Sequence, residues 1–309
     1  MITAQMVKEL REKTGAGMMK CKEALNECNG NLEEAIDFLR KKGLASADKR
    51  SGRATSQGLV VPLISENRRT AGIVEANCET DFVAKTDDFI NFANKLAELV
   101  LNTPSVKSTS DLEKLSIDGQ TIDDYRKSMI AKTGENITIG RAEHLEIPSG
   151  SNGFFDNYVH GNGAIGVIVE VKTADSTAAT NTEAIQAVHN IALQAAAMKP
   201  LYTFSNDVPV EVMNREKDVI IGQIKNDPKN ANKPEEIVNK IVEGRLAKYC
   251  EENCLFNQVF FLDDTKKISD LLTDLSKKIG SEVTLVSFRR WARGEGCETP
   301  EEATAEAGA

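Results

Sequence analysis

Hydrophobic residues in the stretch 3–43 recur at helical spacing in three short groups, separated by breaks at 14–17 and 29–30. Asn31 can cap the third helix, with Glu34 three residues later as its reciprocal partner. The pattern predicts three short helices that pack as a bundle. A unit of about forty residues is marginally stable alone, and such units typically serve as docking modules.

Two later segments share one design, in which a pair of β-rich runs is followed by a helical pattern. A constant shift along the chain aligns Gly72 with Gly166 and Asp81 with Asp175, which favours an internal duplication. Paired strands followed by a helix predict antiparallel sheets with helices on one face, and therefore an α+β fold. The predicted strands are 58–62 with 71–78 and 156–160 with 165–171, and the predicted helices are 87–101 and 182–198.

The remaining apolar patterns predict a helical hairpin and a short closing unit. In the polar stretch 102–150, the pattern predicts a helix near 121–132 and then a turn that enters a strand. Residues 209–252 carry two facing apolar stripes around a polar loop at 227–234. The first stripe is Val212, Val219, Ile220 and Ile224, and the second is Ile237, Val238, Ile241, Val242 and Leu246.

After the hairpin, the pattern predicts a short closing unit. Its elements are a strand at 258–262, a helix at 268–279 and a strand at 283–288.

Composition and charge exclude several classes of protein. The net charge of −9 argues against a general nucleic-acid binder, which usually carries a basic excess. No apolar run approaches the roughly 18 residues that cross a bilayer, and the N-terminal sequence opens directly into a helical pattern instead of a signal peptide. The 6 cysteines form no C-x-x-C pair, which is typical of a reducing compartment. We therefore expect a cytoplasmic protein without a membrane partner.

Catalytic chemistry finds little support in the sequence. His144, His160 and His189 stand in unrelated contexts, and neither a G-x-S-x-G elbow nor a zinc spacing occurs. Residues 161–166 match G-x-G-x-x-G, but a β-rich run follows where a dinucleotide site needs a helix, so we interpret the motif as a turn. No P-loop motif is present. We expect no catalytic residue, no metal, no cofactor and no direct nucleotide binding; a metabolic enzyme that uses the glycine turn is the alternative.

Two apolar features suggest contact with another protein. Met18 and Met19 open the second helix, where neighbouring side chains point about 100° apart, so both cannot face one core. An exposed, pliable methionine suits a partner surface. Phe82 and Val83 lie in an otherwise polar connection that follows the strand 71–78. One interpretation is a hydrophobic staple on the next helix, and the other is an aromatic side chain that projects beside Asp81 and wedges into a partner.

Two long motifs carry a family resemblance. The run 7–25, VKELREKTGAGMMKCKEAL, and the run 80–85, TDFVAK, resemble the two signatures of bacterial elongation factor Ts. The segments 242–245 and 198–200 are also similar to that family. The resemblance extends in order over nearly the whole chain.

The resemblance implies a ubiquitin-associated (UBA)-like N-terminal bundle, two related α+β core subdomains and an inserted helical hairpin. It also implies guanine-nucleotide exchange on elongation factor Tu, a GTPase, with displacement of its Mg²⁺. Thr133 stands where the resemblance leads us to expect an apolar residue. The implied partner-binding residues are Arg11, Met18, Met19, Thr133, Gly134 and His160, and the residues implied to intrude near the magnesium site are Thr80, Asp81, Phe82 and Val83.

An interaction scaffold is an alternative to the nucleotide-exchange function. Such a scaffold would use the bundle and the hairpin to dock proteins without nucleotide exchange, and a buried Phe82 would favour it.

The chain is predicted to divide into several parts. These are a docking bundle at 1–45, a linker at 46–57, core subdomains at 58–150 and 151–296, the hairpin 209–252 within the second subdomain, and a disordered acidic tail at 297–309.

Overall fold

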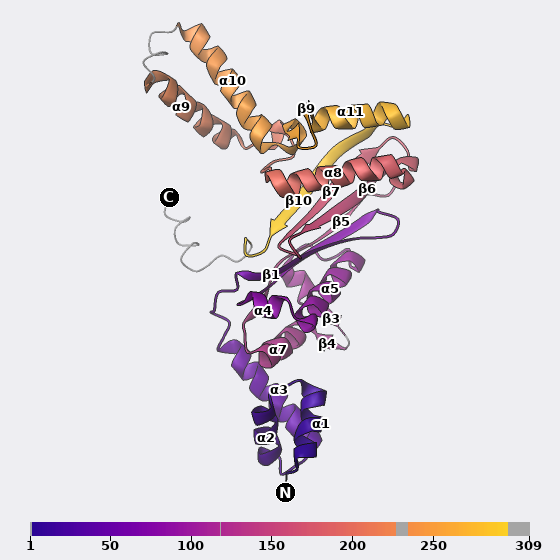
Figure 1. The fold of residues 1–309 in the computed structure, drawn as a ribbon, viewed down its shortest axis with the longest axis vertical. Helices are drawn as coiled ribbons and strands as arrows, with labels where there is room; N and C mark the ends of the chain where they lie inside the picture. Colours follow the sequence, from indigo (N-terminus) through magenta and orange to yellow (C-terminus); the bar gives the residue numbers. More distant parts are fainter. Residues whose placement is uncertain (1, 118, 227–233, 296–309) are drawn as a thin grey trace.

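The computed structural model describes residues 2–117, 119–226 and 234–295. These form an elongated α+β molecule with a helical bundle at one end, two sheets with their helices in the middle and a helical hairpin at the other end (Figure 1). The predicted loop at 227–234 falls almost entirely outside the described residues, as does the predicted tail at 297–309.

The N-terminal bundle contains the three predicted helices. They are α1 (Ala4–Thr14), α2 (Met18–Glu27) and α3 (Leu32–Asp48), and they enclose a small core around Leu10, Cys21 and Leu25. The side chain of Asn31 accepts hydrogen bonds from the backbone N–H groups of Glu33 and Glu34, which confirms the predicted cap. The Glu34 carboxylate accepts a hydrogen bond from the side-chain amide of Asn31 at 2.9 Å. In a complete capping box it would accept from the backbone N–H of Asn31 instead.

The first core unit is a three-stranded antiparallel sheet in the order β1-β2-β5. The helices α5 and α7 lie against it, and Phe89, Phe92 and Leu96 of α5 are fully buried in the shared core. The elements of this unit are β1 (Gln57–Ile64), β2 (Thr70–Cys78), α5 (Asp87–Asn102), α6 (Thr109–Leu112), β3 (Ser116–Ile117), β4 (Gln120–Thr121), α7 (Ile122–Thr133) and β5 (Ile137–Glu146).

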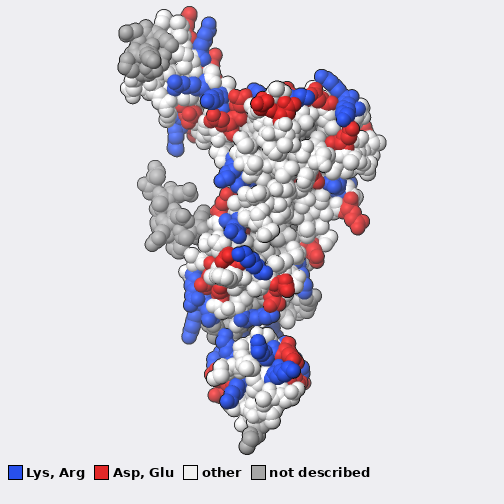
Figure 2. All heavy atoms as spheres, in the orientation of Figure 1, with Lys and Arg blue, Asp and Glu red and all other residues white. Residues whose placement is uncertain are grey.

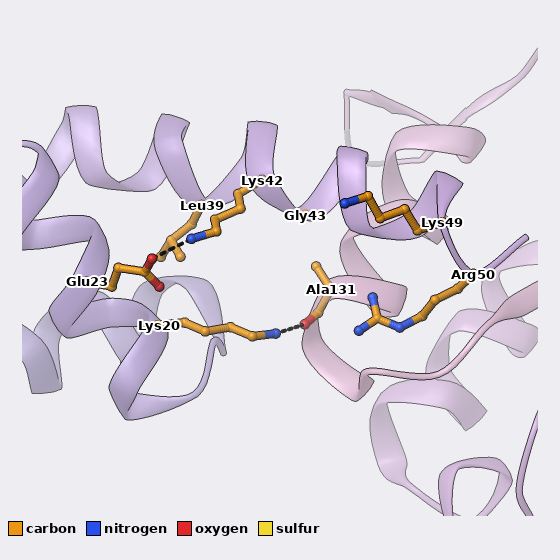
Figure 3. A pocket seen from close by; sticks show the side chains of 8 residues that line it. All are labelled: Lys20, Glu23, Leu39, Lys42, Gly43, Lys49, Arg50 and Ala131. Atoms are coloured by element: carbon orange, nitrogen blue, oxygen red, sulfur yellow. Dashed lines mark hydrogen bonds and ion pairs between the residues drawn. The ribbon is translucent and has the colours of Figure 1, made fainter.

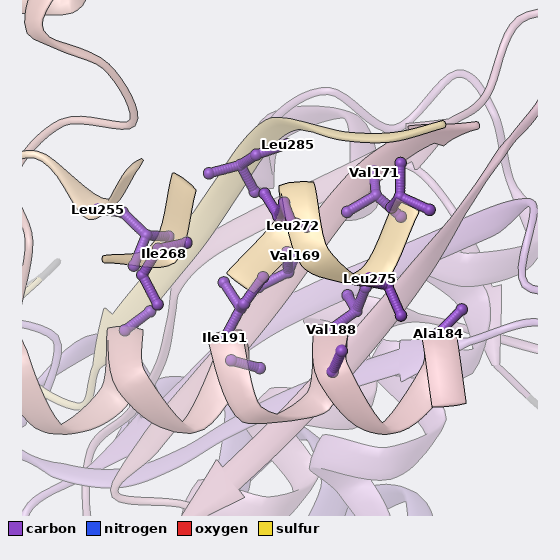
Figure 4. Close-up of a cluster of buried hydrophobic side chains, with 14 of the residues drawn as sticks. Val169, Val171, Ala184, Val188, Ile191, Leu255, Ile268, Leu272, Leu275 and Leu285 are labelled. Atoms are coloured by element: carbon purple, nitrogen blue, oxygen red, sulfur yellow. The ribbon is translucent and has the colours of Figure 1, made fainter. Parts of the chain in front are cut away.

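The second core unit has a similar plan, with an antiparallel sheet in the order β10-β7-β6. The helices α8 and α11 pack on it through a layer of aliphatic side chains that includes Val169, Ile191 and Leu272 (Figure 4). The elements are β6 (Gly153–His160), β7 (Ile165–Thr173), the 3-10 turn Thr177–Thr180, α8 (Thr182–Met198), α11 (Ile268–Ile279) and β10 (Val283–Ala292).

The two core units are joined by a mixed apolar and ionic contact. Val60, Ile73, Phe155 and Ile168 bury their side chains in one cluster between the sheets. At its edge, Arg68 donates to the buried carboxylate of Asp156 at 2.7 Å. Burying this ion pair is tolerable because each charge meets a partner.

The predicted hairpin is present as α9 (Val210–Asn226) and α10 (Glu235–Asn253). Ile220, Ile224 and Val242 are buried where the helices meet. The prediction that Val219 and Ile237 also face inward is wrong, because both side chains are exposed. Two isolated helices bury only a narrow seam between them, so the outer flanks of each apolar stripe remain in solvent.

The prediction of a strand at 258–262 is only partly confirmed. The strand β8 is limited to Val259–Phe260, and the chain then turns and returns as β9 (Asp263–Lys267), which carries mostly polar residues. A polar strand of this kind lacks the alternating apolar pattern that would reveal it in the sequence. The short 3-10 turns Ser205–Asp207 and Leu255–Asn257 complete this region.

Candidate functional site

The segment that follows β2 forms a single helical turn, α4 (Asp81–Ala84), that was not predicted as a helix. Thr80 caps it by accepting a hydrogen bond from the backbone N–H of Val83 at 3.4 Å. The side chain of Phe82 is 80% exposed, whereas that of Val83 is half-buried and packs on the first core. The staple interpretation therefore fits Val83, and the projecting-aromatic interpretation fits Phe82.

A carboxylate from another element fastens the start of α4. Glu135, which lies just beyond α7, accepts a hydrogen bond from the backbone N–H of Thr80 at 3.0 Å. Its second oxygen accepts from the Thr80 hydroxyl at 2.6 Å. The thiol of Cys78 also donates to the Thr80 carbonyl at 3.1 Å. These bonds fix the backbone that presents Phe82 to solvent.

The carboxylate beside Phe82 is ionised. Lys85 donates to Asp81 at 2.5 Å across one helical turn. This hydrogen bond, together with the positive charge, holds the pKa of Asp81 below its usual value of 3.8. An exposed aromatic ring with a charged carboxylate next to it therefore protrudes from a short, fixed turn.

The chain between α3 and β1 is packed against the base of this turn. The guanidinium of Arg53 pairs with Glu79 at 3.3 Å, and the Arg53 carbonyl accepts from the side-chain amide of Asn136 at 2.9 Å. The Glu79 carboxylate also accepts from the backbone N–H of Asn136 at 2.6 Å. The predicted linker is thus attached to the core immediately beside Thr80.

The two methionines of the N-terminal bundle are both exposed. Met18 and Met19 open α2 with exposed fractions of 58% and 78%, and Arg11 is exposed on α1. Lys20, the next residue of α2, reaches the carbonyl of Ala131 in α7 at 3.4 Å. The bundle therefore lies against the same helix whose C-terminal end leads to Glu135.

The predicted residues Thr133 and Gly134 form that C-terminal end. Gly134 adopts a left-handed conformation with φ 79° and donates its N–H to the carbonyl of Ile130, a typical helix C-cap. The hydroxyl of Thr133 donates to the carbonyl of Met129 at 2.9 Å and accepts from the N–H of Glu135 at 3.2 Å. Thr133 therefore uses its hydroxyl locally, to shape the turn that presents Glu135.

His160 lies apart from this group, at the end of β6 in the second core unit. Its Nδ1 is 3.1 Å from the hydroxyl of Tyr158. The glycine turn that follows it packs on the first unit, where the carbonyl of Gly163 accepts from the N–H of Val60 at 2.8 Å. The strand β7 begins at Ile165, directly after this turn, which confirms the turn interpretation of the G-x-G-x-x-G match.

The structure brings Thr80, at the start of α4, next to the end of α7, and it places the bundle against α7, as the order of α4, α7 and α2 in Figure 1 shows. The sequence did not single out Glu135 or Lys85, although Glu135 directly follows the glycine cap and Lys85 lies one turn from Asp81.

Within residues 2–117, 119–226 and 234–295, no cluster of metal-ligating side chains is present, and no helix has the length and apolar character to cross a membrane.

Comparison with known proteins gives consistent matches. The family model described as "Elongation factor TS" matches residues 79–295. The chain is 43% identical over 307 residues to "Elongation factor Ts" of Clostridium perfringens (strain SM101 / Type A), which covers 99% of this chain and 97% of the relative. It is 40% identical over 308 residues to "Elongation factor Ts" of Clostridium tetani (strain Massachusetts / E88), which covers 99% of this chain and 98% of the relative.

Proposed function

This chain belongs to the elongation factor Ts family, and we propose that it promotes release of GDP from elongation factor Tu so that GTP can bind during translation elongation. The observation that carries the proposal is the exposed Phe82 on a turn fixed by Glu135. Aromatic side chains are enriched in protein–protein interfaces, and a ring presented to solvent on a fixed turn is suited to insertion into a partner.

In this proposal, Thr80, Asp81, Phe82 and Val83 form the wedge. Phe82 inserts into the partner and keeps a segment near its bound Mg²⁺ displaced. Asp81 carries a negative charge next to that ring, and Val83 anchors the turn to the core. Loss of Mg²⁺ removes charge that binds the nucleotide phosphates, so the nucleotide dissociates faster.

The energy for release comes from linkage between the two binding events. A protein that binds the nucleotide-free partner more tightly than the nucleotide-bound form weakens nucleotide binding by the same factor. No bond is made or broken, so no side chain requires a tuned pKa and the protein is not an enzyme in the chemical sense. The nucleotide belongs to the partner.

We propose that Arg11, Met18 and Met19 of this chain contact the nucleotide-binding domain of the partner. We include Thr133 and Gly134 in the same interface, because they form the end of α7 that leads to Glu135. His160, which lies on the second core unit, is the outlying member of the same interface. Exposed methionine suits such a surface because it adapts its shape to a partner.

We further propose that the parts of the chain carry separate tasks. The UBA-like bundle 1–45 docks, the segment 46–57 links it to the core, and the related subdomains 58–150 and 151–296 present the wedge and support it. The helix α3 continues to Asp48, past the proposed boundary, so bundle and linker share one helix.

The proposal is tested by the rate at which labelled GDP leaves elongation factor Tu, measured by stopped-flow fluorescence with and without this protein. Exchange activity predicts strong acceleration that saturates with concentration. The scaffold alternative predicts binding without acceleration, and the exposure of Phe82 argues against it. Absence of acceleration by the intact protein would exclude the exchange function.

A further inference from the structure

The proposed interface is positioned by contacts between segments that lie far apart in the sequence. Lys20 of α2 reaches the carbonyl of Ala131 and so holds the bundle against α7 (Figure 3). Glu135 fastens Thr80 at the start of the wedge. Figure 2 shows the bundle as a separate lobe, so a partner that contacts both the bundle and the second core unit extends along the first. His160, on the second unit, requires a support of its own.

His160 lies where the two core units meet. Its strand, β6, is an edge strand of the second sheet and runs beside β1, where the side-chain amide of Asn157 donates to the carbonyl of Pro62 at 3.0 Å. At the end of this strand His160 is exposed, and the preceding Val159 is 44% exposed. Both side chains are therefore accessible to a partner that lies across the junction.

A hydrogen bond within β6 restricts the His160 ring. Residues two apart on a strand lie on the same face, and the hydroxyl of Tyr158 is 3.1 Å from Nδ1 of His160. The centroids of the two rings are 6.1 Å apart. Within the residues that the structure describes, this is the one hydrogen bond of either side chain. Nδ1 is therefore bound, whereas Nε2 has no partner in this part of the chain.

Tyr158 is itself held by a partly buried network. Its ring packs on the second core and meets the ring of His189 edge to face, with centroids 5.9 Å apart and an interplanar angle of 86°. Nδ1 of His189 donates to the buried carboxylate of Asp156 at 2.8 Å, and the other oxygen of Asp156 accepts from Arg68 at 2.7 Å. The position of the Tyr158 hydroxyl is thus fixed by contacts that reach the first core unit.

The direction of the bond between Tyr158 and His160 follows from the chemistry of the two groups. A neutral imidazole has one N–H donor and one acceptor nitrogen, and the hydrogen bond at one nitrogen decides which of the two carries the proton. A phenolic O–H is the stronger donor and an imidazole nitrogen is the stronger acceptor, so Tyr158 donates to Nδ1. The proton of the neutral His160 ring then lies on Nε2, which becomes a donor.

We propose that Tyr158 is a positioning residue for His160. It holds the ring in the Nε2–H tautomer, so that His160 donates a hydrogen bond to an acceptor oxygen of the partner. The contact with the partner rests on the proposed nucleotide-exchange function, whereas the tautomer is a property of the free protein. A donor that is already fixed in direction loses less conformational entropy on binding than a freely rotating ring, so the hydrogen bond contributes more to affinity.

The first test is the tautomer of His160 in the free full-length protein. Long-range proton–nitrogen NMR correlations show it at about pH 8, where histidine side chains are ordinarily neutral. We expect a single Nε2–H form in wild type. Tyr158→Phe keeps the aromatic ring but removes the hydroxyl, and the Nδ1–H form should then become detectable. A wild-type His160 with its proton on Nδ1, or the same tautomer population in wild type and variant, would overturn the proposal.

The second test is a double-mutant cycle, measured by stopped-flow release of labelled GDP from elongation factor Tu. His160→Ala should raise the half-saturating concentration of this protein about two- to tenfold, the effect of one hydrogen bond, and Tyr158→Phe should raise it by a smaller factor. Neither should change the maximal acceleration, because the wedge is intact. Tyr249→Phe, at a half-buried tyrosine of α10, is the matched control and should change neither quantity.

The double variant separates positioning from an independent role of Tyr158. If Tyr158 acts through His160, the double variant should have the same half-saturating concentration as His160→Ala alone. Additive effects of the two substitutions would overturn the positioning role. Absence of acceleration by wild type would overturn the proposed function and the partner contact with it, and the NMR spectrum would still decide whether Tyr158 sets the tautomer.

Discussion

Glu135 and Thr80, which are far apart in sequence, are joined by two hydrogen bonds, one to the Thr80 N–H at 3.0 Å and one to its hydroxyl at 2.6 Å. The carboxylate thereby satisfies a backbone donor at the start of α4 that the single helical turn leaves unpaired. A helix of four residues has almost no stability of its own. The presentation of Phe82 therefore depends on the end of α7.

Replacing Glu135 with glutamine should loosen this turn. Glutamine keeps one acceptor oxygen but loses the charge, so we expect a loss of about 1 to 2 kcal/mol in the free energy of unfolding. The acceleration of GDP release should also fall, because the wedge is less fixed. Urea unfolding and stopped-flow exchange measure the two effects. Glu113→Gln, at an exposed residue of the same core unit, is the control and should change neither.

Replacing Lys85 with methionine should raise the pKa of Asp81 toward its usual 3.8, because the hydrogen bond and charge that lower it are removed. The contact with Lys85 favours the ionised form of Asp81. The stability that this contact contributes is therefore present above the unfolded-state pKa of Asp81 and is lost as the pH falls through its lower folded-state pKa. Carboxyl NMR titration of wild type and variant measures the shift. An Asp81 pKa that does not rise in the variant would show that Lys85 is not its cause.

The thiol of Cys78 should be unreactive in the folded protein. Burial, reinforced by the negative charge of Glu135, raises the pKa of Cys78 to about 12. Only the thiolate reacts with alkylating reagents, so Cys78 should resist iodoacetamide near pH 8 and react after unfolding in urea. Because its folded-state pKa is raised, the stability that this thiol contributes is complete below the unfolded-state pKa of 9.0 and decreases as the pH rises toward 12. Rapid alkylation of the folded protein at Cys78 would contradict the buried position.

The packing of the bundle on α7 should be sensitive to a single methyl group. A Cβ atom at Gly43 would lie 2.8 Å from the Cβ atom of Ala131, so Gly43→Ala must push α3 away from α7. Overpacking costs about 1 to 3 kcal/mol and the helix propensity of alanine returns only about 1 kcal/mol, so we expect a net loss in the free energy of unfolding. Gly244→Ala in α10, where a Cβ atom meets nothing within 4 Å, should instead stabilise the protein. Urea unfolding measures the free energy of unfolding of both variants. A change of the same sign in both would contradict the predicted overpacking at Gly43.

The sequence allows most helices and the paired strands to be predicted, because their apolar residues repeat with a clear period. It does not reveal α4 or β9, since a turn of four residues and a polar strand have no periodic signal. Val219 and Ile237 belong to regular stripes yet remain exposed, because a periodic pattern cannot show how wide the buried seam of a hairpin is.

The candidate site is only partly predictable for a related reason. Phe82 could be singled out as an apolar residue in a polar connection, but its exposure depends on which way a single helical turn is fixed. That direction is set by Glu135, whose contact with Thr80 joins segments that are distant in sequence. Such a contact leaves no pattern in a single chain, so the identity of the anchor requires the structure.

Stopped-flow release of labelled GDP from elongation factor Tu tests most directly the proposal that Phe82 acts as a wedge. Because the side chain is 80% exposed, Phe82→Ala should change the free energy of unfolding by less than about 0.5 kcal/mol. We expect the same variant to reduce the acceleration of GDP release at least about tenfold, the effect of roughly 1.4 kcal/mol. Val219→Ala, which removes an exposed apolar group from the hairpin, serves as the control and should leave the acceleration unchanged. Full acceleration by the Phe82→Ala protein would contradict the wedge.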